Sequence, residues 1–210
     1  MHYPTIKEQN LSSLNKIGFS VLASACLMEI LKRQRDAVGV SVYSDEFEFY
    51  APEKSSERHH HMLLSKLNEI LSTSARKRNT DTYTYLHQIA EKLKRRSLIF
   101  LFTDMFQADA EEEKLFEAIR HLKYNRHEVI LFHVMDEKRE LDFNFENTPR
   151  RFTDVETGAE VDLYSDNIRE NYIKAVQNYL AELKMQCAKY RIKYVEADIN
   201  RNFDNILTAY

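Results

Sequence analysis

The sequence predicts an α/β fold: a mostly parallel sheet with helices on both faces. Two runs of apolar residues, SLIFLF at 97–102 and EVILFHV at 128–134, have the composition of strands that are buried on both faces, as in parallel sheets. Segments with helical periodicity come before and after each run, and strands that alternate with helices are typical of parallel sheets. Because no repeat or linker interrupts this pattern, we expect one domain over residues 1–210.

Composition excludes several classes of protein. The net charge of -3 argues against a basic surface that binds nucleic acid. The sequence has only three glycines, too few to form a glycine-rich phosphate-binding loop. Cys26 and Cys187 are too few for a disulfide framework or a zinc cluster, which favours a reducing, cytoplasmic compartment. No apolar run approaches the roughly 18 residues that span a bilayer, and residues 1–10 are polar, without a signal-peptide pattern. We therefore expect a cytoplasmic protein without a membrane span.

The first half of the chain predicts a helix, a strand pair and two more helices. Residues 14–33 are apolar nearly all round, as in a helix packed against a sheet. The runs 37–43 and 46–50, joined by a tight turn, predict an antiparallel pair at the sheet edge. Helices are expected at 57–73 and from about 80–82 to 94–96.

The second half predicts three strands with helices between them. The strand 97–102 ends in Thr103-Asp104 and is followed by a helix at 110–125 and a strand at 128–134. Within 140–163, alternating residues around Gly158 predict a small hairpin. The remaining elements are a long helix at 166–190, a strand at 193–198 and a short helix at 202–210.

Two residues near one end of the sheet suggest a site. Functional groups of open α/β sheets gather beyond the carboxyl ends of the strands. Asp104 directly follows such a strand, and Thr80 precedes the helix upstream of it. Their oxygens are hard ligands that suit Mg²⁺, Mn²⁺ or Ca²⁺. The alternative is structural: Asp104 as a turn residue and Thr80 as a helix cap.

Several motifs resemble a known family. SLIFLFTDM resembles the fourth strand of von Willebrand factor A domains, and TDTYTYL resembles their threonine loop. Four longer segments, in order, resemble domain-of-unknown-function family 58, a bacterial von Willebrand A-like family, over essentially the whole chain: NKIGFSVLASACLMEILKRQRDAVGVSVYSD, KRRSLIFLFTDMF, HEVILFHVMDEKRELDF and RFTDVETGAEV. The resemblance implies a von Willebrand factor A-like (Rossmann-like) fold and a metal-ion-dependent adhesion site with Thr80 and Asp104 as ligands.

One part of the family pattern is missing. Members with the full site carry D-x-S-x-S-M after their first strand, and this chain starts at Met1, where the Met of that motif would fall. We therefore expect an N-terminally truncated domain without its first central strand and without three ligands. Mg²⁺ or Mn²⁺ would be held weakly at such an incomplete site. Unpaired strand edges would make this chain marginally stable.

The expected function is protein–protein interaction without catalysis. The docking face would surround the two ligands and include Asp81, Thr82, Tyr83 and Met105. Family 58 proteins are commonly encoded beside MoxR-type AAA+ ATPases, so the resemblance implies such a partner in the assembly or maturation of other proteins.

Two other functions remain open. One is a metal-assisted hydrolase or phosphotransferase that uses Asp104, with Asp45, Asp136 and Asp198 loosely placed around it. The other is a nonfunctional fragment. The consecutive histidines at 59–61 point about 100° apart on a helix, which predicts a solvated helix start and no shared metal ion.

Overall fold

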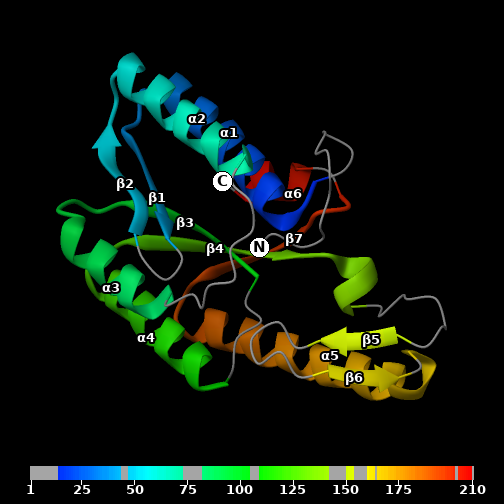
Figure 1. Ribbon diagram of the computed structural model, residues 1–210. Helices are drawn as coiled ribbons and strands as arrows, with labels where there is room; N and C mark the ends of the chain where they lie inside the picture. The colour runs from blue at the N-terminus through cyan, green and yellow to red at the C-terminus, as the bar shows by residue number, and fades with distance from the viewer. Residues whose placement is uncertain are drawn as a thin grey trace.

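The structure is a computed structural model that describes residues 14–43, 47–72, 82–104, 109–141, 150–153, 160–163, 165–201 and 203–209. Strands and helices alternate along the chain, which confirms the predicted α/β class (Figure 1). The elements are α1 (Lys16–Arg33), β1 (Val38–Tyr43), β2 (Phe47–Lys54), α2 (Glu57–Ser72), α3 (Thr82–Lys92), β3 (Leu98–Thr103), α4 (Asp109–Tyr124), β4 (Glu128–Met135), the π-helix η1 (Glu137–Leu141), β5 (Arg150–Thr153), β6 (Glu160–Leu163), α5 (Ser165–Lys189), β7 (Lys193–Asp198) and α6 (Asp204–Ala209).

A three-stranded parallel sheet forms the centre of the fold. Its order is β3-β4-β7, with Leu98 opposite Glu128 and Ile130 opposite Lys193 at the start of the two ladders. Every residue of β4 after Glu128 is buried. The prediction that the continuous apolar runs form parallel strands is therefore confirmed.

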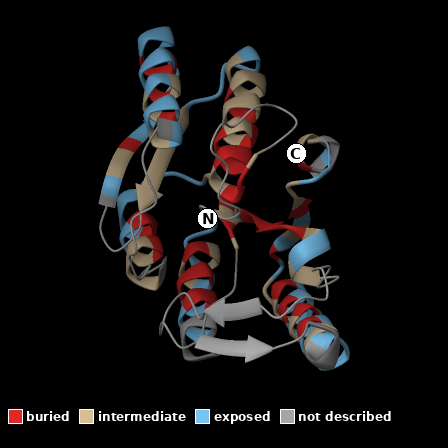
Figure 2. Ribbon diagram, turned by 45° about the vertical axis from the view of Figure 1, so that its right-hand side comes forward, coloured by how far each residue is buried: buried red, intermediate tan, exposed pale blue. Residues whose placement is uncertain are grey.

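Helices cover both faces of this sheet. One core joins β3 and β4 to α3, α4 and α5, and a second core joins β4 and β7 to α1 and α6. Figure 1 shows α1 and α6 on one side of the sheet and α3, α4 and α5 on the other. In Figure 2 the buried residues, in red, gather where these helices meet the strands.

Helix α1 is apolar nearly all round because it packs on two sides. Phe19 and Leu27 face the sheet, whereas Val21 and Met28 belong to a third core with α2 and the β1–β2 pair. The helix begins after Asn15, whose Oδ1 accepts a hydrogen bond from the Gly18 N–H at 2.8 Å and so satisfies one of the free donors of the first turn.

The strands β1 and β2 form an antiparallel pair, as predicted, but not an edge of the parallel sheet. Within the described residues they pair only with each other, and β3 pairs only with β4. The expectation that the pair continues the sheet is therefore wrong for this structure. The pair is instead attached through side chains, because Val38, Val40, Phe49 and Ala51 pack in the third core. Its register shifts between Val38 and Val40.

Three turns that lead from a helix into a strand share one conformation. Arg35, Arg126 and Arg191 have φ of 64°, 64° and 55°, the left-handed region that normally favours glycine. In each turn the next N–H donates to a carbonyl five residues back: Asp36 to Leu31, His127 to Leu122 and Ile192 to Cys187, at 2.9 to 3.1 Å. These are Schellman caps with arginine in the usual glycine position.

The remaining elements agree with the sequence apart from two differences. The β5–β6 hairpin is confirmed, with Arg150 opposite Leu163, whereas the π-helix η1 was not predicted and α3 ends at Lys92, earlier than expected. Cys26 and Cys187 are free thiols. Among the described helices, none is both long and apolar enough to cross a membrane.

Candidate functional site

The carboxyl ends of the three parallel strands each carry an aspartate. Asp104 follows β3, Asp136 follows β4, and Asp198 is the last residue of β7. Because the strands are parallel, these residues lie at the same end of the sheet. Three acidic side chains therefore lie at this end of the sheet.

His133 links the three parallel strands near this end of the sheet. It is fully buried in β4, its Nε2 lies 2.9 Å from the Asp104 carbonyl oxygen, and its Nδ1 lies 2.8 Å from the Tyr194 hydroxyl. A carbonyl oxygen can only accept, so Nε2 carries the hydrogen and Nδ1 accepts from the tyrosine. Burial lowers the pKa of His133 to about 4, with the Lys16 charge adding to this effect, so the ring is neutral at pH 7.

Lys16 brings a buried positive charge to the same end of the sheet. It lies in the first turn of α1, is 2% exposed, and places Nζ 2.5 Å from Oε1 of Glu140 in η1. Burial raises the pKa of the Asp104 carboxyl, but positive charge, to which Lys16 contributes, and hydrogen bonds to the carboxylate together outweigh burial and leave that pKa below its ordinary value. Asp104 is therefore an ionised carboxylate at the end of β3.

Tyr43, at the end of β1, completes this group. Burial raises its pKa, and the negative charge of Asp104 raises it further, so the end of β1 lies within electrostatic reach of the end of β3. We call the following residues the strand-end cluster: Lys16, Tyr43, Asp104, His133, Glu140 and Tyr194.

The other two aspartates belong to a hydrogen-bonded network around η1. Asp136 is 1% exposed and accepts from Arg139 Nη1 at 3.0 Å and from Asn200 Nδ2 at 2.9 Å. Asp198 accepts from the Glu137 N–H at 3.3 Å and from Asn200. Because these oxygens already have donors, the two carboxylates anchor η1 to β7.

The predicted site residues fall partly outside the described residues. Thr80, Asp81 and Met105 lie there, as does Asp45. Thr82 is the first residue of α3. Tyr83 is half-buried, packs against the core of α3, α4 and α5, and meets His87 edge-on with ring centroids 4.6 Å apart. Of the predicted docking residues, Tyr83 thus has a packing role in this structure.

At the carboxyl ends of the strands, the described residues do not by themselves form a site for Mg²⁺ or Mn²⁺. Among them, no three His, Cys, Asp or Glu side chains come close enough to hold a metal ion. Of the two expected ligands only Asp104 is described, and the Lys16 ammonium already supplies positive charge near it.

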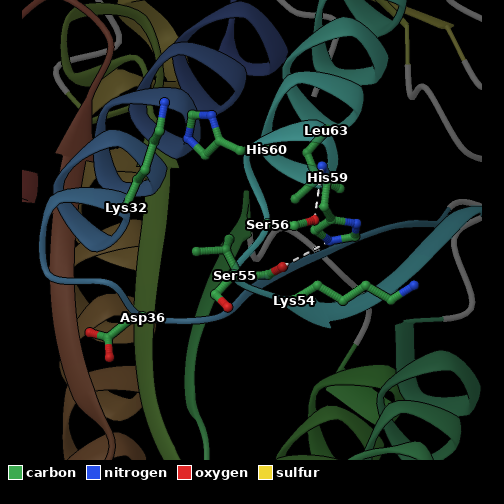
Figure 3. Close-up of a pocket in the computed structure, with 9 residues that line it drawn as sticks. Lys32, Asp36, Lys54, Ser55, Ser56, His59, His60 and Leu63 are labelled. Carbon is green, nitrogen blue, oxygen red and sulfur yellow. Dashed lines mark hydrogen bonds between the residues drawn. The ribbon is translucent and has the colours of Figure 1, made fainter.

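The histidines at 59–61 do not converge. His59 Nε2 lies 3.1 Å from the Val38 carbonyl oxygen, His60 Nε2 lies 3.8 Å from Glu29 Oε2, and the His61 ring is near Glu57. Figure 3 shows His59 and His60 turned in different directions in a small pocket at the start of α2. The prediction of a solvated helix start is wrong for His59 and His60, which are buried under β1 and α1.

Sequence reasoning missed the strand-end cluster apart from Asp104. Lys16 is a charged residue at the start of an apolar helix, which is the usual pattern of a solvated end. His133 interrupts an apolar strand run, and this is the one signal in the sequence that a buried polar contact was needed. Its partner Tyr194 is 61 positions away, so pairing required the fold.

Together these observations define an α/β protein with a buried polar cluster at the carboxyl ends of a parallel sheet. The chain belongs to the family described as "Protein of unknown function DUF58", whose model matches residues 9–182. No curated protein and no solved structure matches the chain.

Proposed function

We propose that this protein is a protein–protein interaction module of the von Willebrand factor A type, and that the partner docks at the carboxyl end of β3. The observation that carries the proposal is the position of Asp104. It is a half-buried carboxylate with a lowered pKa, and it ends a strand that pairs on one side only within the described residues. A fixed negative charge beside an open strand edge favours a partner with complementary charge.

The exposure of β3 supports the proposal that the sheet is incomplete beside this strand. The run LIFLFT has the composition of a central strand, yet Ile99, Phe100 and Phe102 are only half-buried, in contrast to the fully buried β4. The end of β1 approaches the end of β3 through Tyr43 and Asp104. We propose that a further strand belongs between β1 and β3, as in the von Willebrand factor A fold.

The proposed partner is a MoxR-type AAA+ ATPase that acts in the assembly or maturation of other proteins. The family resemblance supports this choice. Mg²⁺ or Mn²⁺ would take part only when such a further strand supplies D-x-S-x-S ligands. The location we propose is the cytoplasm.

Binding of a purified MoxR-type ATPase to the chain, measured with and without an added strand that ends in D-x-S-x-S, tests the proposal. We expect Asp104→Asn to weaken binding at least about tenfold, because removal of one charge from a desolvated pair costs 2 kcal/mol or more. Asp36→Asn is the matched control, since Asp36 is exposed and precedes β1 at its amino end. Equal binding by Asp104→Asn and the unchanged chain would overturn the docking face.

Metal titration distinguishes the other functions. We expect Mg²⁺ or Mn²⁺ to bind the version with the added strand but not the present chain. Asp104→Ala in the version with the added strand should abolish this binding. Turnover of a phosphoester by the purified protein, abolished by the same substitution, would instead favour the metal-assisted hydrolase or phosphotransferase.

A further inference from the structure

We propose that α3 and α4 share a site for a divalent first-row transition metal, with His87 and His121 as ligands and Glu91 as a positioning residue. His87 lies in α3 and His121 in α4, and their Nδ1 atoms are 2.8 Å apart, with ring centroids at 4.9 Å. This site is separate from the strand-end cluster and does not depend on the function proposed above.

Glu91 prepares His121 to bind a metal. Its Oε1 lies 3.2 Å from the His121 Nε2. A carboxylate only accepts, so Nε2 of the neutral ring carries the hydrogen, and the lone pair of His121 Nδ1 points toward His87. A carboxylate behind the second ring nitrogen is the usual arrangement for histidines that bind metals, because it fixes the tautomer and raises the basicity of the ligand.

His87 can supply the second ligand. In the metal-free pair its Nδ1 donates the hydrogen to His121. Its Nε2 is buried and has no hydrogen-bond partner among the described residues. No contact at Nε2 therefore holds the ring in one tautomer, and a move of the hydrogen to Nε2 breaks only the hydrogen bond that the metal replaces.

The separation of the two nitrogens indicates which metals fit. Metal–imidazole bonds are about 2.0–2.1 Å long, so two ligands at 90° have nitrogens about 2.9 Å apart, and two at the tetrahedral angle about 3.4 Å apart. The observed 2.8 Å matches neighbouring positions of an octahedral or square-planar ion. Imidazole is a good ligand for such ions, Ni²⁺, Co²⁺ and Cu²⁺ among them. The side chains of His121 and Glu91 are 27% and 73% exposed, so we expect water to fill the remaining positions.

Titration of the full chain, without a histidine tag, with Ni²⁺ and Co²⁺ in a calorimeter tests this site. We expect one saturable site per chain. His87→Asn and His121→Gln, which keep polar groups of similar size, should each lower the affinity at least about tenfold, and circular dichroism checks that they fold. His61→Ala is the control, because it removes an exposed histidine from α2 and should leave the affinity unchanged.

Two further measurements distinguish residues that take part in the metal site from residues that only lie near it. Glu91→Ala should lower the affinity about tenfold or more, as loss of such supporting carboxylates does, whereas Glu91→Gln, whose amide oxygen still accepts, should restore most of it. Substoichiometric Ni²⁺ should broaden the imidazole NMR signals of His87 and His121 first. No saturable binding, unchanged affinity in both histidine variants, or first broadening at 59–61 would each overturn the proposal.

Discussion

His133 shows how one buried polar residue organises the site. Its ring reaches the carbonyl oxygen after β3 and the hydroxyl of a β7 tyrosine, so it links all three parallel strands. In the neutral ring Nδ1 accepts from Tyr194, whereas protonation would place a positive charge in a buried site and reverse the direction of this hydrogen bond. The free energy of folding therefore depends on the protonation of His133.

This dependence gives a pH prediction. The folded-state pKa of about 4 lies below the ordinary value of about 6.5, so the unfolded chain takes up a proton that the folded chain does not. The free energy of unfolding should fall as the pH drops from about 6.5 to about 4, by about 3 kcal/mol from this residue, with no further loss below that range. Urea unfolding at several pH values should show this slope in the unchanged chain.

His133→Gln serves as the comparison for that slope. Glutamine does not titrate, so the variant should be less stable at pH 7 and should lose less stability between pH 6.5 and 4. Parallel pH profiles for the two proteins would contradict the role of His133.

At the residue scale, sequence reasoning found Asp104 and missed its neighbours. A terminal aspartate after an apolar strand is a local pattern, and it was recognised. The charge of Lys16 reaches Asp104 only because α1 packs over the sheet, and the Tyr194 contact depends on the register of β4 and β7. Long-range contacts of this kind leave little trace in local sequence.

At the scale of elements, an ion pair clamps α1 to η1. Lys16 and Glu140 are 3% and 15% exposed at their side chains, so the charges are largely withdrawn from water. Lys16→Met should lower the free energy of unfolding by about 3 kcal/mol, because it leaves a largely buried carboxylate without its cationic partner. Chemical denaturation measures this loss.

The control for this clamp is an exposed pair of similar length. Lys184 and Glu196 are 2.6 Å apart but about half-exposed, so Lys184→Met should cost less than about 1 kcal/mol. Equal losses in the two lysine variants would show that burial of the pair is unimportant.

The β1–β2 pair depends on a glycine at its bulge. A Cβ at Gly39 would lie 2.7 Å from the Ala51 carbonyl oxygen and 2.9 Å from the Glu53 nitrogen, both backbone atoms of β2. Gly39→Ala should therefore force the strands apart and lower the free energy of unfolding by about 1–3 kcal/mol. An unchanged midpoint in a denaturant titration would contradict this.

Most elements could be predicted because their signals are local. Apolar runs of six or seven residues indicated β3 and β4, and alternation around Gly158 indicated the β5–β6 hairpin. The π-helix could not be predicted, because its first residue, Glu137, contacts Asp198 and Arg201, about 60 positions further along the chain.

At the scale of the whole molecule, one side of β3 pairs with none of the described strands. Leu98, at the start of that strand, is 38% exposed, and an open apolar edge favours pairing between chains. We predict that the chain is marginally stable and self-associates at high concentration, and that Leu98→Lys reduces this self-association. Sedimentation velocity measures the self-association. Leu71→Lys is the control, since Leu71 is 39% exposed on α2. A monomeric, cooperatively melting, highly stable chain would contradict this prediction.

The assembly of the sheet was predicted only in part. The parallel order of β3, β4 and β7 follows from alternating strands and helices, whereas the separation of the β1–β2 pair does not. Whether two strands pair depends on which other segments pack between them, and the local composition of a strand does not indicate this.

The three left-handed arginines also have a consequence for engineering. Each precedes a strand, so the turns before β4 and β7 lie at the amino end of the sheet, at the end opposite to Asp104. Arginine in this conformation costs about 1–2 kcal/mol, partly offset by the extra chain entropy of glycine, so each Arg→Gly change should raise stability by about 0.5–1 kcal/mol. The melting temperature of the triple variant should rise while Asp104-dependent binding stays the same. The protein therefore keeps its conformational strain and its charged end apart, and a thermally robust version for partner screening can be made without redesigning the surface being screened.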